Sequence, residues 1–441
     1  MKRDVSGWGR FPKVMAEVSR PRDEADLRSS LGDGPVIARG NGRSYGDAAA
    51  QPAGTVDMRG FSRFIDFDAE TGVLVAEAGV MLGDVIAAFL PRGWFPPVTP
   101  GTKFATLGGM IAADVHGKNH RRDGSIGRHV EWVEVMGADG EVRRATPCDN
   151  SDLFATTVGG MGLTGMILRC AIRLMRVESG WIRQETHVCA DLDAAMAVFE
   201  AAESRYAVAW FDCLGSGASL GRSLVMLGDH AVPSELSGTR AVRPFEVPVR
   251  RRKRVPLDAP GFALNRYTIR AFNTLYHAAN ARKAGVGYVD WDSYFYPLDA
   301  VLEWNRIYGR RGFAQYQVVL PLAMAREGLT QLLSAISEAG QGSFLAVLKR
   351  LGPQDSRLSF PMEGYTLALD FPVSEAALAL LDRLDTITLA HGGRYYLAKD
   401  SRVPAEVLRK ADPRLAEFGM TRRAEGLNRA FASVQSERLG L

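Results

Sequence analysis

Pro35-Val36-Ile37-Ala38-Arg39 is a buried-strand pattern that runs directly into Gly40-Asn41-Gly42-Arg43-Ser44-Tyr45-Gly46-Asp47, a loop with three glycines in its first seven positions. Glycine tolerates positive φ and close backbone approach, so successive N–H groups of such a loop can converge on a pyrophosphate. The spacing Gly-x-Gly-x-x-x-Gly misses the dinucleotide fingerprint by one residue, and the loop lacks the Gly-Lys-Ser/Thr ending of a P-loop. By itself it indicates an anion cradle no more strongly than a plain tight turn.

Two further glycine-rich segments, 99–119 and 157–165, follow in the same half of the chain. Small residues at Gly108 and Gly109 leave room for a large planar ligand against the backbone. His116 is followed by Gly117 and Lys118. A lone histidine is more often structural, but one set between glycine-rich segments favours a chemical role. Together the segments predict an extended dinucleotide bed.

Short strands surround these segments, and one helix lies among them. The pattern predicts strands at 35–39, 72–79, 130–136 and 165–172, a helix at 82–90 and a hairpin turn at Asp139-Gly140. No strand–helix–strand unit repeats, so we expect an α+β fold and not a parallel βαβ array.

After residue 177 the pattern changes to longer helices and fewer glycine loops. We expect helices at 192–202 and 325–339, and strands at 206–213, 316–320 and 366–371. A length of 441 residues also favours more than one core. We therefore predict a first domain over 1–177, a second over 178–393, and a C-terminal segment over 394–441 that returns to the first.

The composition is that of a globular protein, with 46% hydrophobic and 24% charged residues. A formal net charge of +4 gives no basic face of the kind that binds nucleic acid. Neither a disulfide framework nor a zinc site is expected, because Cys148, Cys170, Cys189 and Cys213 show no Cys-x-x-Cys spacing. We expect a cytoplasmic protein, because the first residues lack a signal-peptide pattern and no apolar run approaches roughly 20 residues.

One basic stretch, Arg250-Arg251-Arg252-Lys253-Arg254, lies between Pro248 and Pro256. Two interpretations stay open. It is either a solvated surface loop or a basic loop that contacts anionic lipid or a phosphate-bearing substrate, peripherally at the inner membrane.

The glycine-rich segments resemble the FAD-contacting segments of the vanillyl-alcohol oxidase superfamily, through Arg39–Ser44, Pro100–Thr102, Thr106–Gly109 and Val158–Gly165. Four later motifs, at His116–His120, Glu303–Arg306, Phe313–Gln317 and Tyr396–Ser401, resemble its decaprenylphosphoryl-β-D-ribose 2′-oxidase family. The resemblance spans nearly the whole chain. It implies a two-domain PCMH-type FAD-binding fold with an α+β substrate (cap) domain.

The resemblance also implies the residues that hold the cofactor. Arg43 stands where related alditol oxidases carry a histidine bonded to the flavin, so FAD is expected to be non-covalent. The implied cofactor-binding residues are Ala38, Arg39, Gly40, Asn41, Gly42, Arg43, Ser44, Tyr45, Gly46, Asp47, Ala48, Gly101, Thr106, Leu107, Gly108, Gly109, Ala113, Asp114, Val115, His116, Ile167, Tyr396 and Lys399. No metal is expected.

The resemblance implies His116, Lys118 and Lys399 as catalytic residues. It assigns substrate binding to Tyr45, Lys118, Trp210, Gln315, Gln317 and Lys349. Gln315 and Gln317 lie two apart on a predicted strand, so their side chains share one face. Without the resemblance, an exposed polar face is an equal interpretation. Lys349 and Arg350 are either a substrate-phosphate contact or a pair of exposed charges. A cysteine that reacts with nitroaromatic inhibitors in the family corresponds to Ala368.

The implied reaction is oxidation of a secondary sugar hydroxyl to a ketone by hydride transfer to flavin N5. The family's substrate is a polyprenylphosphoryl-β-D-ribose, oxidised at the 2′-hydroxyl, and a separate NAD(P)H-dependent ketoreductase would complete an epimerisation. Two alternatives stay open: a soluble sugar, alditol or aldonolactone oxidase that uses oxygen, and a flavin-fold binding subunit without turnover.

Overall fold

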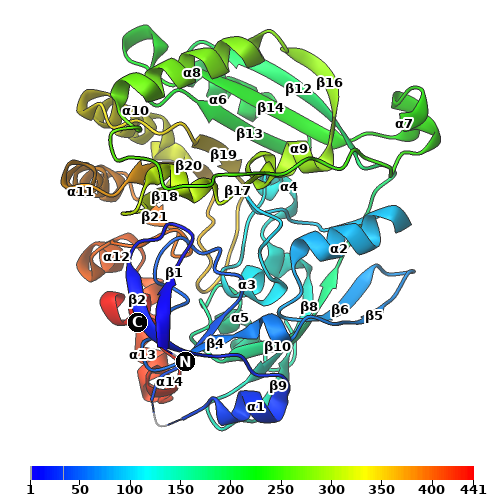
Figure 1. Cartoon of the computed structure of the whole chain (residues 1–441), viewed down its shortest axis with the longest axis vertical. Coiled ribbons are helices and arrows are strands. Elements are labelled where there is room, and N and C mark those ends of the chain that lie inside the picture. Colours follow the sequence, from blue (N-terminus) through cyan, green and yellow to red (C-terminus); the bar gives the residue numbers. More distant parts are fainter. Residues whose placement is uncertain (1, 33) are drawn as a thin grey trace.

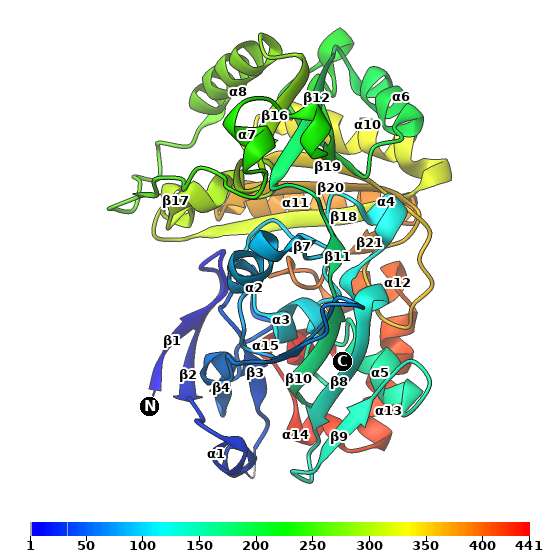
Figure 2. The same cartoon turned by 90° about the vertical axis from the view of Figure 1, so that its right-hand side faces the viewer.

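The computed structural model describes residues 2–32 and 34–441. Figure 1 shows two halves along the long axis. The upper half is built on one large sheet with long helices, and the lower half holds smaller sheets and both labelled chain ends. Figure 2 shows the same division from the side, with β18, β20 and β21 bordering the lower half.

The lower half contains two larger sheets and the two-stranded pair β7–β11. The first has the order β1 (Lys2–Ser6), β2 (Lys13–Ser19), β4 (Thr55–Asp57) and β3 (Ile37–Arg39). The second is antiparallel, with the order β5 (Phe64–Phe67), β6 (Val73–Glu77), β10 (Met166–Arg173), β8 (Val130–Met136) and β9 (Val142–Ala145). Short elements surround them: α1 (Glu24–Ser29), α2 (Leu82–Phe89), β7 (Trp94–Phe95), α3 (Leu107–Ala112), α4 (His120–Asp123), α5 (Ser151–Thr157) and β11 (Met175–Arg176). Each glycine-rich segment therefore joins or borders these strands.

The upper half is organised around an eight-stranded sheet. Its order is β16 (Gly285–Asp290), β12 (Trp181–Cys189), β14 (Ser223–His230), β13 (Tyr206–Phe211), β19 (Ala346–Leu351), β20 (Gly364–Pro372), β18 (Phe313–Pro321) and β21 (Arg394–Tyr395), with antiparallel pairing throughout. The helices of this half are α6 (Leu192–Ala201), α7 (Thr239–Val242), α8 (Arg266–Ala281), α9 (Trp291–Phe295), α10 (Leu322–Ala339) and α11 (Glu375–Ala390), and β15 (Lys253–Arg254) pairs with β17 (Val301–Leu302).

Apolar and polar side chains alternate along β18, which gives the large sheet one apolar face and one polar face. Tyr316, Val318 and Leu320 belong to one apolar cluster with Leu332 of α10 and Leu384 of α11. Because side chains alternate along a strand, Gln315 and Gln317 point to the opposite face. The helices therefore bury one face, and the other is left for polar groups.

Local signals explain where the long helices begin and end. Asp191 caps α6 by accepting a hydrogen bond from Ala194 N, and Ser374 caps α11 in the same way through Ala377 N. Gly340 ends α10 at φ +62°, a left-handed conformation that favours glycine. The predicted strands and helices are confirmed, with α10 beginning three residues earlier than expected.

The C-terminal segment contacts both halves. It comprises β21, α12 (Ala405–Ala411), α13 (Arg414–Ala424), α14 (Leu427–Ala430) and α15 (Val434–Leu439). β21 pairs with β18 of the large sheet, whereas Phe431 bridges to Val36 of the lower half. The domain boundaries at 177 and 393 stay predictions.

Two expectations from the sequence concern the cysteines and membrane-spanning segments. All four cysteines, which lie in the described part of the chain, are free. Over residues 2–32 and 34–441, no helix combines the length and apolarity needed to cross a membrane.

Candidate active site

The polar face of the eight-stranded sheet gathers most of the residues expected to bind substrate. Directly paired residues on antiparallel strands share a face. Trp210 pairs with Val347, Val347 with Ala368, and Ala368 with Gln317. One row further in each direction, Lys349 pairs with Thr366 and Asp370 pairs with Gln315. This face consequently presents Trp210, Gln315, Gln317, Lys349, Ala368 and Asp370.

His116 connects the glycine-rich half to this face. It is only 4% exposed, and Nε2 of Gln317 lies 3.2 Å from its Nε2. The rings of Phe360 and Tyr396 lie 5.4 and 5.2 Å from the imidazole centroid to centroid. Burial lowers the pKa of His116 well below its ordinary value, and the charges of Lys349, His120 and Lys399 lower it further. His116 is therefore a neutral imidazole that could accept a proton.

Lys399 lies beside Tyr45, with its Nζ 3.5 Å from the centre of the phenol ring. Burial lowers the pKa of the Lys399 ammonium, while the carboxylate of Asp370 opposes that shift. Burial raises the pKa of Asp370, which accepts a hydrogen bond from Gln315 Nε2 at 2.5 Å. A backbone hydrogen bond keeps Tyr45 beside Lys399, because Tyr45 N donates to Ala398 O at 2.9 Å.

Two more lysines lie near this site. Lys118 Nζ donates to the carbonyl of Tyr294 and lies 4.3 Å from the centre of the Tyr294 ring. Burial lowers the pKa of Lys118 to about 7, helped by the charge of Lys349. Burial alone lowers the pKa of Lys349 to about 8. An anion placed beside either amine would favour its charged form and raise its pKa again.

Arg350, next to Lys349, is directed differently. It is 6% exposed, and its guanidinium pairs with Glu200 at 2.9 Å and Glu363 at 3.1 Å. The expectation of a substrate-phosphate contact and the alternative of an exposed charge are both wrong for Arg350. Adjacent residues of a strand point to opposite faces, so only Lys349 reaches the polar face.

The cofactor segments contain buried polar atoms that have no protein partner. Within the described residues these include Arg43 Nε, Thr99 Oγ1, His116 Nδ1 and Ser401 Oγ. A buried polar atom without a partner is costly, so these atoms fit a polar ligand. A Cβ at Gly40 would lie 2.2 Å from Thr106 Oγ1, whereas a Cβ at Gly101 would meet no atom within 4 Å. The loop 38–48 thus packs tightly on α3, and space is left beside Gly101. These features fit FAD.

The guanidinium of Arg43 is held by aromatic rings. It lies 4.1 Å from the centre of Trp8 and 5.1 Å from the centre of Phe104. Burial lowers its pKa, which the nearby Asp299 partly offsets. Asn41 is fixed beside it by donating to Phe104 O at 2.9 Å.

Three further residues expected at the cofactor, Ala113, Asp114 and Ile167, and one expected at the substrate, Trp210, lie on separate parts of the chain. Ala113 accepts a hydrogen bond from the Tyr396 hydroxyl at 3.3 Å. Asp114, at φ +39°, accepts from Ser125 and Gly127 N and so fixes the segment before His116. Ile167 lies buried on β10. Trp210 donates to Phe344 O and packs on Tyr276 of α8, so it lies on the polar face beside α8.

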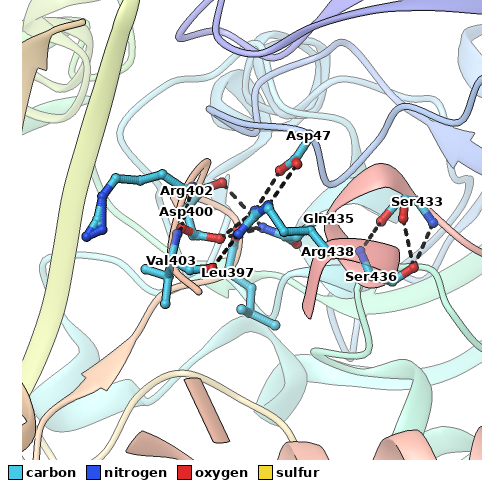
Figure 3. Close-up of polar contacts among 9 residues, drawn as sticks. All are labelled: Asp47, Leu397, Asp400, Arg402, Val403, Ser433, Gln435, Ser436 and Arg438. Carbon is cyan, nitrogen blue, oxygen red and sulfur yellow. Dashed lines mark hydrogen bonds and ion pairs between the residues drawn. The ribbon is translucent and has the colours of Figure 1, made fainter. Parts of the chain in front are cut away.

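A buried ion-pair network supports the loops that carry Tyr45 and Lys399 (Figure 3). Arg438 of α15 donates to Asp47 at 3.0 Å and to Asp400 at 2.8 Å. Asp400 in turn accepts from the backbone N–H groups of Arg402 and Val403. Gln435 Nε2 donates to Leu397 O at 2.8 Å. A helix from the C-terminal segment thereby fixes both loops.

Sequence reasoning missed several residues of this site. Asp370 lies in phase with Ala368 and Thr366 on β20, and a single carboxylate in an otherwise apolar strand was the available signal. Tyr308, whose hydroxyl lies 3.5 Å from Asp370, gave no comparable signal. Tyr294, Phe295 and Phe360 are aromatic residues that sequence alone assigns to a core.

Comparisons with known proteins agree with this geometry. Residues 16–146 match the family model described as an FAD binding domain, which makes FAD the cofactor. The chain is 37% identical to decaprenylphosphoryl-beta-D-ribose oxidase of Mycolicibacterium smegmatis, over 99% of this chain and 97% of that protein. It is 27% identical to human delta(24)-sterol reductase over 39% of this chain and 34% of that protein. A solved structure of a BBE-like 1 protein from Physcomitrella patens matches with a TM-score of 0.65 at 14% identity, covering 94% of this chain and 90% of that one, which shows the shared fold. The α+β, PCMH-type expectation is confirmed.

Proposed function

The chain belongs to the decaprenylphosphoryl-β-D-ribose oxidase family, and on that premise we propose that it oxidises the 2′-hydroxyl of a polyprenylphosphoryl-β-D-ribose to a ketone. The observation that carries the proposal is the meeting of His116 with Gln317 on a face that also presents Lys349. That face offers a neutral base, amide groups for a sugar and cations for a phosphate.

We assign the roles as follows. FAD, when bound, supplies hydride acceptance at N5. His116 accepts the proton of the sugar hydroxyl. Lys399, held beside Tyr45, provides positive charge toward the part of the flavin where negative charge develops on hydride transfer. Gln315 and Gln317 hydrogen-bond the sugar, and Lys118 and Lys349 attract the phosphate.

The cofactor is proposed to be bound without a covalent link. The support is Arg43, because a guanidinium stacked on Trp8 replaces the histidine that would form such a link. An absorption spectrum taken before and after acid precipitation tests this. Yellow colour in the supernatant is expected, and colour retained in the pellet would contradict the proposal.

Two partners follow from the proposed reaction. The ketone must be reduced on its opposite face to complete an epimerisation, so we propose a separate NAD(P)H-dependent ketoreductase. A lipid-linked substrate also requires contact with a membrane surface, for which the stretch Arg250–Arg254 is a candidate.

The test is anaerobic flavin reduction by a short-chain prenylphosphoryl ribose dissolved in buffer. We expect bleaching of the flavin absorbance by the wild type. His116→Ala and Lys399→Ala should lose that reduction while FAD stays bound, and Lys410→Ala, on the exposed side of α12, serves as the control. A flavin that stays oxidised in the wild type would refute the substrate. Anaerobic flavin reduction by free sugars, followed by peroxide release once oxygen is admitted, would identify a soluble sugar oxidase instead. No reduction by any sugar would favour a binding subunit.

A further inference from the structure

The stretch 259–289 carries positively charged side chains and no negatively charged ones. It contains Arg266, Arg270, Arg282 and Lys283 but no aspartate or glutamate, although the whole chain balances 54 basic against 50 acidic residues. In the part of the chain that the structure describes, none of these four cations forms an ion pair, and all are exposed. Their charge is therefore available to an external anion.

The same stretch exposes large apolar side chains. Tyr267 of α8 is 72% exposed and Leu275 is 71% exposed, and Phe262 just before the helix is 80% exposed. Only Ile269 and Asn273 of α8 are buried. Figure 1 shows α8 along the outer edge of the upper half, far from the lower half. Exposed apolar residues interleaved with cations are the pattern of a helix that lies in a lipid interface.

The basic stretch 250–254 offers less free charge than the stretch 259–289. Arg250 donates to the carbonyls of Asp292, Tyr296 and Pro297. Arg254 pairs with Glu303 at 3.3 Å. These two cations already have partners within the protein, so three cations of 250–254 remain, against four in the stretch 259–289. The stretch 259–289 is therefore the stronger lipid surface.

A row of aromatic rings joins α8 to the active site. Phe272, 43% exposed on α8, lies 5.7 Å from Phe344 between ring centroids. Phe344 lies 5.5 Å from Tyr308, which stacks on Phe313 at 4.3 Å. Phe313 meets Tyr45 at 5.4 Å, where Lys399 also lies. Tyr308, Phe313 and Tyr45 of this row are buried, so the row packs α8 against the part of the fold that carries the residues proposed for catalysis.

We propose that the exposed side of α8 docks on an anionic lipid bilayer, the surface in which a lipid-linked substrate is held. This inference rests on the proposed function for its substrate, whereas the docking itself is independent of turnover. Anionic lipid matches a surface that carries only cations around apolar side chains. Each such cation strengthens binding about fivefold near an anionic bilayer.

Cosedimentation of the FAD-loaded protein with vesicles tests the docking. We expect binding to phosphatidylglycerol vesicles, little binding to phosphatidylcholine vesicles, and weakening as salt rises. Arg270→Glu combined with Leu275→Ser should weaken binding on the order of tenfold or more. The matched control is Lys13→Glu with Met15→Ser, which changes an exposed cation and an exposed apolar residue on β2. Melting temperature and flavin absorbance of each variant check the fold.

Several outcomes would overturn the inference: no vesicle binding by the wild type, equal binding by the α8 variant, or an equal loss in the β2 control. The soluble short-chain substrate separates this from the proposed function. Flavin reduction by that substrate without vesicle binding would remove the docking and keep the function. Vesicle binding through α8 without flavin reduction would keep the docking and remove the assigned substrate.

Discussion

Gln317 of β18 places its amide nitrogen 3.2 Å from Nε2 of His116, and so joins the large sheet to the glycine-rich half at the proposed site. The amide also lies 3.3 Å from Thr366 Oγ1. A donor at Nε2 favours the neutral imidazole. Besides its proposed hydrogen bond to the sugar, Gln317 thus also positions the proposed base.

Replacing Gln317 tests that relationship. Gln317→Leu removes the donor, so we expect kcat to fall about tenfold and the acid limb of the pH profile to move to higher pH. Flavin reduction measured from pH 5 to pH 9 reports both changes. Gln354→Leu is the comparison, because Gln354 contacts the neighbouring His120 through its carbonyl oxygen, which lies 2.7 Å from His120 Nε2 and accepts a hydrogen bond. An acid limb that stays in place in Gln317→Leu would contradict this role.

The lowered pKa of Lys118 predicts how the free energy of unfolding depends on pH. The folded pKa of about 7 lies below the ordinary lysine value of 10.5, so between these two pH values the unfolded chain binds one more proton than the folded chain. This residue therefore adds stability as pH rises from about 7, and its contribution is smallest below pH 7. Urea unfolding at pH 6 to 9 should show that slope in the wild type, at most about 1.4 kcal/mol per pH unit, and its loss in Lys118→Met. Parallel curves for the two proteins would refute it.

Arg438 predicts a coupling between the C-terminal helix and FAD retention. Arg438→Met would leave the buried Asp47 and Asp400 without their cation, at a cost of about 3–5 kcal/mol. We expect a lower unfolding midpoint and FAD release at a lower temperature. Arg423→Met, which removes one exposed contact to Gly440 O, should change neither. Unchanged FAD release in Arg438→Met would show that the network does not support the cofactor loops.

Ala368 predicts a response to nitroaromatic inhibitors that capture a cysteine. It pairs with Gln317 on the polar face, where the wild type has no thiol. The intact mass of the wild type should stay unchanged after incubation with inhibitor and substrate, although Cys148 is exposed. Ala368→Cys should gain the mass of one inhibitor. A mass increase in the wild type, or none in Ala368→Cys, would contradict this placement.

The sequence shows which side chains of a strand share a face. It does not show which face of the sheet the helices cover. The two-residue spacing of Gln315 and Gln317 correctly gives a shared side. Lys349 and Arg350 could not be separated, because neighbouring positions reveal opposite faces without saying which one is covered by helices. Asp370 was missed because its partners, Gln315 and Tyr308, come from distant parts of the chain. The glycine-rich segments were recognisable because close backbone approach restricts the residue type locally.

The tie from Arg438 to Asp47 and Asp400 has a consequence for biosynthesis. A ribosome releases α15 after every element that this helix contacts. During translation, the loops around Tyr45 and Lys399 can therefore form these ion pairs only after α15 has been synthesised. A nascent chain lacking residues 434–439 would hold its cofactor poorly, so tight loading of FAD is an event that follows synthesis of the C-terminal helix.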